Sequence, residues 1–106
     1  MTSFGDDKIL EHFLHEIRSR LGEQLKEVIL FGSRARGDNV PGSDYDCLAV
    51  LDEVSPQAKD IIDEVAGELL FQHNALFSIF LLSEEEHKQQ THDPFLRNVR
   101  KEGVIL

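Results

Sequence analysis

The chain has 106 residues, the length of one domain with a single hydrophobic core, and we predict one domain over residues 1–106. Its 20 acidic residues outnumber its 11 lysines and arginines and give a formal net charge of −9. This charge disfavours nucleic acid as a substrate, because each approaching phosphate would have to be screened.

Three elements are predicted in the first half of the chain. Over residues 6–22, apolar side chains recur at helical spacing and Gly22 stops the pattern, which predicts an amphipathic helix. The short apolar run of residues 26–31 ends at a glycine and predicts a strand. Residues 47–51 predict a second strand in the same way.

The second half of the chain predicts a helix, a strand and two further helices. Pro56 opens a helix that runs to about residue 72 with its apolar side chains along one side. Residues 75–82 are apolar without polar alternation, as in a strand covered on both faces. Ser83 and Glu86 form the pattern of a capping box at the start of a short helix.

The last helix has clear signals at both ends. Asp93 and Pro94 supply an N-cap and a first-turn proline, and Gly103 ends the helix. Residues 104–106 are apolar, so we expect them to pack on the sheet or to join an interface. The predicted order is α, β, loop, β, α, β, α, α.

Targeting signals and disulfides are not expected. No apolar run approaches the ~20 residues that span a bilayer, which argues against a membrane segment, and residues 2–7 are too polar for a secretory signal. The single cysteine, Cys47, cannot form an internal disulfide, and its place in an apolar run predicts a buried structural thiol. We therefore expect a protein of the reducing cytoplasm.

The connection between the first two strands indicates how they pair. About a dozen residues separate Phe31 from Tyr45, and glycines and a proline among them leave little room for the helical crossover that parallel neighbours need. We therefore predict antiparallel strands. In that arrangement the end of the first strand and the start of the second share one edge of the sheet.

Residues suited to phosphate follow the first strand. Gly32 lets the backbone approach a ligand closely, and Ser33 adds a hydroxyl and a backbone N–H at a turn or helix start. Arg34 and Arg36 are candidates for phosphate contacts or, alternatively, solubilising charges. Ser43 is a further candidate for nucleotide binding, with capping of the following turn as its alternative.

Two carboxylates suited to a metal precede the second strand. Asp44 and Asp46 lie two residues apart in an extended segment, so both point to one face with roughly 7 Å between their α-carbons. Both side chains can reach one Mg²⁺ ion or a pair of ions, since magnesium prefers carboxylate, phosphate and water oxygens. Together with the glycine and serine, they predict metal-dependent chemistry on a nucleoside triphosphate.

The run from residue 32 to residue 46, GSRARGDNVPGSDYD, resembles the signature of the minimal nucleotidyltransferases, small relatives of the DNA polymerase β superfamily. That signature is Gly-Ser, ten residues, and then Asp-x-Asp. The resemblance implies an α+β fold with a small mixed or antiparallel sheet flanked by helices. It also implies that Ser33 with Gly32 positions the triphosphate of ATP and that Asp44 and Asp46 ligate magnesium. An acceptor hydroxyl would then attack the α-phosphorus with loss of pyrophosphate.

The resemblance also implies a partner. Stand-alone members of the family are commonly paired with a small helical HEPN-domain ribonuclease toxin, and in some systems the nucleotidyltransferase is the antitoxin that attaches AMP to a tyrosine of the toxin. The acidic surface of this chain fits a protein acceptor better than an RNA end. A small-molecule nucleotidyltransferase is a further alternative, although 106 residues leave little chain for a dedicated acceptor pocket.

One position departs from the family pattern. Many superfamily members carry a third carboxylate on the strand after the second helix, and Ser78 stands where that acid would be expected. Glu84, Glu85 and Glu86 lie just beyond that strand and are expected to be a solvated helix start. Either catalysis proceeds with two carboxylates, or the chain is a binding module that neutralises its partner stoichiometrically.

Two further clusters are weaker candidates. His12 and His15 share a helix face at a spacing compatible with a metal, but no third ligand accompanies them, and we expect exposed side chains. Arg97, Arg100 and Lys101 form a basic stripe on the last helix. Their charges could be solvated, could stabilise the helix by lying near its C-terminus, or could contact a nucleotide or partner.

Overall fold

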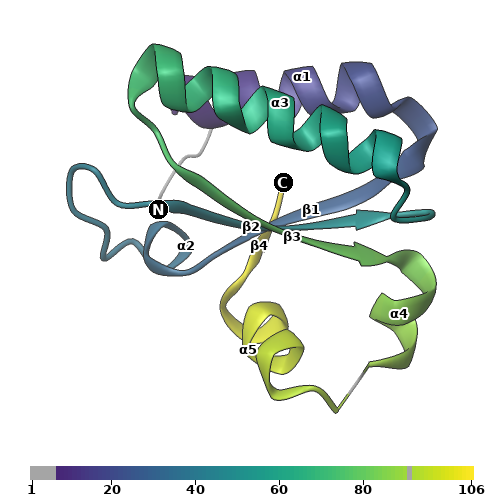
Figure 1. Cartoon of the computed structure of the whole chain (residues 1–106). Helices are drawn as coiled ribbons and strands as arrows, with labels where there is room; N and C mark the ends of the chain where they lie inside the picture. Colours follow the sequence, from purple (N-terminus) through teal and green to yellow (C-terminus); the bar gives the residue numbers. More distant parts are fainter. Residues whose placement is uncertain (1–6, 91) are drawn as a thin grey trace.

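A computed structural model describes residues 7–90 and 92–106 as a four-stranded sheet with helices on both faces (Figure 1). The sheet order is β3-β2-β1-β4, in which β1 is antiparallel to β2 and β4, and β2 is parallel to β3. This confirms the predicted α+β class with a small mixed sheet. In chain order the elements are α1 (Lys8–Leu21), the 3-10 helix η2 (Gly22–Gln24), β1 (Leu25–Phe31), α2 (Ser33–Arg36), β2 (Tyr45–Leu51), α3 (Pro56–His73), β3 (Phe77–Ser83), α4 (Glu84–Gln89), α5 (Pro94–Glu102) and β4 (Val104–Ile105).

Capping side chains fix where the helices begin. The side chains of Asp7, Ser55 and Asp93 each accept a hydrogen bond from a backbone N–H in the first turn of α1, α3 and α5. Ser83 begins α4 with the predicted capping box. The predicted starts of these helices are thus confirmed, except that residue 6, the predicted start of the first helix, lies outside the described residues.

The two faces of the sheet are covered by different helices. In Figure 1, α1 and α3 lie over one face, while α4 and α5 lie on the other. Tyr45 and Cys47 point into the core under α1 and α3. Because side chains alternate along a strand, Asp46 points to the opposite face. On that face α5 buries Leu96 and Val99 in a second cluster with four strand residues, namely Ile29, Phe31, Leu48 and Val50.

The pairing of β1 with β2 confirms the predicted antiparallel arrangement. Phe31, the last residue of β1, is the register partner of Asp46, near the start of β2. The connection between them contains only the single helical turn α2 and a loop. The turn after β1 and the two aspartates therefore share one edge of the sheet.

The strands at the two edges differ from the prediction. Residues 75–82 were expected to be covered on both faces, which is wrong, because β3 is an edge strand and Phe80 remains 48% exposed. The side chain of Phe80 meets Phe31 and Phe95, but α4 and α5 cover that face only in part. At the other edge, residues 104–105 pair with β1 as β4. The apolar end of the chain thus packs on the sheet, but as a strand that the sequence did not predict.

Cys47 is fully buried in the core, as predicted. Among the helices of the described ranges, none combines the length and the apolar character needed to cross a membrane.

Candidate active site

The turn after β1 depends on Gly32. Its backbone angles, φ 75° and ψ −158°, lie in a region that is essentially restricted to glycine. A Cβ atom at this position would overlap with the carboxylate of Asp46. Directly after the glycine, Ser33 begins α2, and the Gly32 carbonyl accepts a hydrogen bond from the backbone N–H of Arg36 at 3.1 Å. Glycine is therefore required for the close approach of this turn to Asp46.

Asp44 and Asp46 lie where β2 begins, with Asp44 exposed and Asp46 partly buried. Burial raises the pKa of the Asp46 carboxyl above its ordinary value, and the negative charges of Asp44 and Glu102 raise it further, while Arg36 lowers it. The two carboxylates are thus close enough to repel each other. A divalent cation bound to both would relieve this repulsion.

The carboxylate pair fits magnesium by its chemistry. Mg²⁺ is typically held by one or two protein carboxylates and completes its octahedral shell with phosphate and water oxygens. Within residues 7–90 and 92–106 there is no group of three or more His, Cys, Asp or Glu side chains that could hold a metal. The carboxylate pair alone suits an ion whose remaining ligands come from the substrate and from water.

A hollow of about 360 Å³ joins the Gly32 turn to α5. Of the predicted site residues, it is lined by Gly32, Ser33, Arg36 and Asp46, which the fold brings together from the turn after β1, from α2 and from β2. The sequence analysis missed the contribution of α5. The additional lining residues are Phe31 from β1 and Phe95, Asn98, Val99 and Glu102 from α5.

A helical pattern could have indicated the α5 contribution. Phe95, Asn98 and Glu102 follow one another at the i, i+3, i+7 spacing of a single helix face. The predicted basic stripe lies elsewhere on α5. Arg97 and Lys101 line a separate hollow of about 430 Å³, and the Arg100 guanidinium donates to the backbone carbonyl of a residue in α4 at 2.6 Å.

Arg34 and Ser43 do not line the Gly32 hollow and make contacts within the protein. The guanidinium carbon of Arg34 lies 3.8 Å from the centroid of the Tyr45 ring, and its Nε donates to the Ser43 carbonyl at 2.9 Å. The Ser43 hydroxyl accepts from the Val40 backbone N–H at 2.9 Å. Both residues thus support the loop that carries Asp44, which is the alternative considered for Ser43.

A family model described as "Nucleotidyltransferase domain" matches residues 10–105. The chain belongs to the nucleotidyltransferase family. The nucleotidyltransferase is 32% identical over 102 residues to a Methanocaldococcus jannaschii protein named "Putative protein adenylyltransferase", with 96% of this chain and 98% of that protein aligned. A second protein of the same name and organism is 31% identical over 98 residues, with coverage of 92% and 94%.

Solved structures share the fold of this nucleotidyltransferase. A toxin-antitoxin structure with AMP-PNP has a TM-score of 0.61 at 18% identity and covers 90% of this chain and 70% of its own. A "putative nucleotidyltransferase" from Sulfolobus solfataricus has a TM-score of 0.57 at 24% identity, with coverage of 92% and 76%. These comparisons confirm the predicted family, fold class and enzyme class.

Ser78, which we expect to stand where many relatives carry a third carboxylate, lies next to Asp46 in the sheet of this nucleotidyltransferase. Ser78 is the register partner of Asp46 in the parallel pair of β2 and β3, so its hydroxyl position lies beside the metal-binding candidate. Glu84, Glu85 and Glu86 lie at the opposite end of β3, where they begin α4. They are a largely exposed helix start, as predicted, and do not replace the acid.

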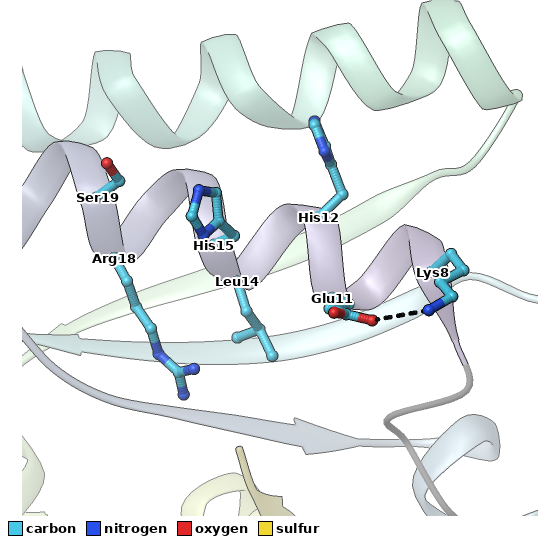
Figure 2. Close-up of a pocket in the computed structure, with 7 residues that line it drawn as sticks. All are labelled: Lys8, Glu11, His12, Leu14, His15, Arg18 and Ser19. Carbon is cyan, nitrogen blue, oxygen red and sulfur yellow. Dashed lines mark ion pairs between the residues drawn. The ribbon is translucent and has the colours of Figure 1, made fainter.

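A second hollow lies along α1 of the nucleotidyltransferase, away from the Gly32 turn. It has a volume of about 740 Å³, and all the described residues that line it come from this one helix (Figure 2). His12 and His15 line it with exposed side chains, as predicted, and Lys8 forms an ion pair with Glu11 at 3.6 Å. The hollow shares no lining residue with the candidate active site.

Proposed function

We propose that this nucleotidyltransferase transfers AMP from ATP to a tyrosine hydroxyl of a partner HEPN-domain ribonuclease toxin, and that it is the antitoxin of the pair. The observation that carries the proposal is one hollow lined by Gly32, Ser33, Arg36 and Asp46. This hollow combines hydrogen-bond donors that can bind an anion with a carboxylate that can bind a metal. Such a combination suits a nucleoside triphosphate with magnesium. The names of the relatives and of the structural neighbour support a protein acceptor and a toxin partner.

Each residue has a defined role in the proposed reaction. The backbone N–H groups of Gly32 and Ser33 and the Ser33 hydroxyl donate to the phosphates, and Arg36 balances part of their charge. Asp44 and Asp46 would hold one or two magnesium ions, which would supply stabilisation of charge on the attacking and leaving oxygens. The acceptor hydroxyl releases its proton to water, and its oxygen forms a bond to the α-phosphorus. The bond from that phosphorus to the bridging oxygen breaks, and pyrophosphate leaves with the electron pair.

The serine beside Asp46 favours a phenolic acceptor. A third carboxylate at this position could take the proton of the attacking hydroxyl, whereas the Ser78 hydroxyl is a poor base. A tyrosine hydroxyl has an ordinary pKa of about 10 and loses its proton far more readily than an aliphatic alcohol. The formal net charge of −9 also favours a protein acceptor over an RNA end.

Transfer of labelled AMP tests the proposal. The nucleotidyltransferase is co-expressed with its genomic neighbour, and the purified complex is incubated with magnesium and ATP labelled at the α-phosphate. We expect label on a tyrosine of the partner, found by peptide mass spectrometry. Asp44→Asn and Asp46→Asn should abolish the labelling. Asp60→Asn, an exposed residue of α3 on the other side of the sheet, is the matched control. Undiminished labelling with both active-site variants would refute the mechanism.

A stoichiometric inhibitor is the second candidate function, and the serine at position 78 is the observation that favours it. In that case the protein neutralises its partner by binding alone. Cells that express the partner with Asp46→Asn would then grow as well as cells that express it with the wild type. Loss of growth in the variant, with an intact complex on pull-down, supports the enzyme.

A further inference from the structure

The carboxylate of Glu102 is bound to two of the donors that we assign to the nucleotide phosphates, the Gly32 N–H and the Arg36 guanidinium. The backbone N–H of Gly32 donates to Glu102 Oε1 at 3.2 Å. The Arg36 guanidinium donates to both carboxylate oxygens, at 3.3 Å to Oε1 and 3.2 Å to Oε2. All three residues line the candidate active site. The negatively charged side chain of Glu102 therefore occupies these hydrogen-bond donors, which could otherwise bind an anionic ligand.

The fold holds Glu102 in this place. It is the last residue of α5, which is anchored to the sheet by the buried side chains of Leu96 and Val99. The next residue, Gly103, donates its backbone N–H to the Val99 carbonyl at 2.7 Å, and β4 then pairs with β1. The side chain of Glu102 is only 23% exposed. The hydrogen bond from Gly32 to Glu102 joins residues 70 apart in the sequence, and the anchored end of α5 holds it in place.

Glu102 could act as the missing third carboxylate, but its contacts argue against this role. Both of its oxygens already accept hydrogen bonds, Oε1 from the Gly32 N–H and both oxygens from the Arg36 guanidinium. Glu102 lines the same hollow as Asp46, but its hydrogen bonds to Gly32 and Arg36 direct its carboxylate to the turn. A triphosphate and this carboxylate carry the same sign of charge and need the same donors. The two anions therefore exclude each other.

We propose that Glu102 is a built-in competitor for the phosphate site, which the donor nucleotide must displace from the Gly32 N–H and from Arg36. This inference rests on the proposed function, since it assumes that a nucleotide uses those donors. Displacement is favourable for a magnesium-bound triphosphate, which supplies several anionic oxygens, and less favourable for a single phosphate group. Glu102 thereby lowers the affinity for each nucleotide whose phosphate needs these two donors.

Nucleotide binding to the full chain tests the inference without a need for turnover. Binding of a non-hydrolysable ATP analogue with magnesium, and of AMP, is measured by calorimetry for wild type and Glu102→Gln. The uncharged amide competes less well, so we expect about threefold to tenfold tighter binding of the analogue and a comparable gain for AMP. Glu102→Asp, whose shorter side chain withdraws the carboxylate, should shift binding in the same direction. Thermal unfolding of both variants confirms that they are folded.

Asp38→Asn is the matched control. Asp38 also pairs with Arg36, at 3.1 Å, but makes no hydrogen bond to Gly32, so its removal should change affinity by less than about twofold. If wild type binds the analogue and neither Glu102 variant binds it more tightly, the inference is wrong and the proposed function stands. A kcat that collapses in Glu102→Gln at unchanged affinity would also overturn the inference, because it would make Glu102 a catalytic carboxylate. If neither wild type nor the variants bind nucleotide, both proposals fail.

Discussion

Replacement of Gly32 by alanine should separate the stability of the turn from its function. Alanine at φ 75° and ψ −158° adopts a strained backbone conformation, which costs about 1–3 kcal/mol. For a domain of this size, that cost lowers Tm by about 5–15 °C. In addition, the new Cβ atom would overlap with the Asp46 carboxylate, so either the turn or the carboxylate has to move.

The displacement should affect catalysis more than folding. A shift of about 1 Å in a catalytic group can cost about 100-fold in rate, so we expect at least that loss of AMP transfer from Gly32→Ala. Circular dichroism measures Tm, and initial rates with labelled ATP measure transfer at a temperature where the variant is fully folded. The rate is then compared only between folded proteins.

Gly42→Ala is the control for backbone strain alone. Gly42 also has a positive φ, 87°, but a Cβ atom there would meet nothing within 4 Å. We expect a loss of about 1–2 kcal/mol in stability and an unchanged rate of transfer. A Gly32→Ala variant that keeps the wild-type rate would refute the close approach of the turn to Asp46 as a requirement for catalysis.

Three further predictions concern side chains around the site. Burial raises the pKa of Tyr45 to about 12, and because Tyr45 is the only tyrosine and the chain has no tryptophan, its ionisation can be followed at 295 nm. The folded protein then holds the Tyr45 proton more tightly than the unfolded chain. The free energy of unfolding should therefore fall by roughly 1.4 kcal/mol per pH unit between pH 10 and 12. A titration midpoint of Tyr45 near pH 10 in the folded protein would contradict this. Burial also raises the pKa of Cys47 to about 12, so a thiol reagent at pH 8 should modify it only after denaturant is added, and rapid modification of the native protein would show that the thiol is accessible. Arg34→Lys keeps the charge but loses the hydrogen bond to the loop before Asp44. We therefore expect kcat to fall while KM for ATP changes by less than about twofold. A large rise in KM would instead assign Arg34 to phosphate binding.

Local signals in the sequence predicted most of the fold. Capping residues such as Ser83 and Asp93 and the apolar periodicity of α1 and α3 act within a few residues, so a single sequence reveals them. The connection between Phe31 and Tyr45 was too short for a crossover helix, which was sufficient to predict antiparallel β1 and β2. The same pairing brought the Gly32 turn to Asp46.

The remaining features depend on tertiary contacts. The two-residue strand β4 forms only because β1 offers a free edge, and a segment of that length has no periodicity to detect. Phe80 lies in an apolar run like that of a central strand, but its exposure follows from the place of β3 at the edge of the sheet. The contact of Glu102 with Gly32 joins residues 70 apart, and no local pattern indicates it.

A crystal structure with manganese in place of magnesium and a non-hydrolysable ATP analogue would test the central claim most directly. Manganese is identified by its anomalous scattering, and it takes the same oxygen ligands. We predict at least one anomalous peak at the Asp44 and Asp46 carboxylates, with a phosphate oxygen hydrogen-bonded to the Gly32 N–H. A nucleotide bound elsewhere, with no metal at the two aspartates, would contradict the account.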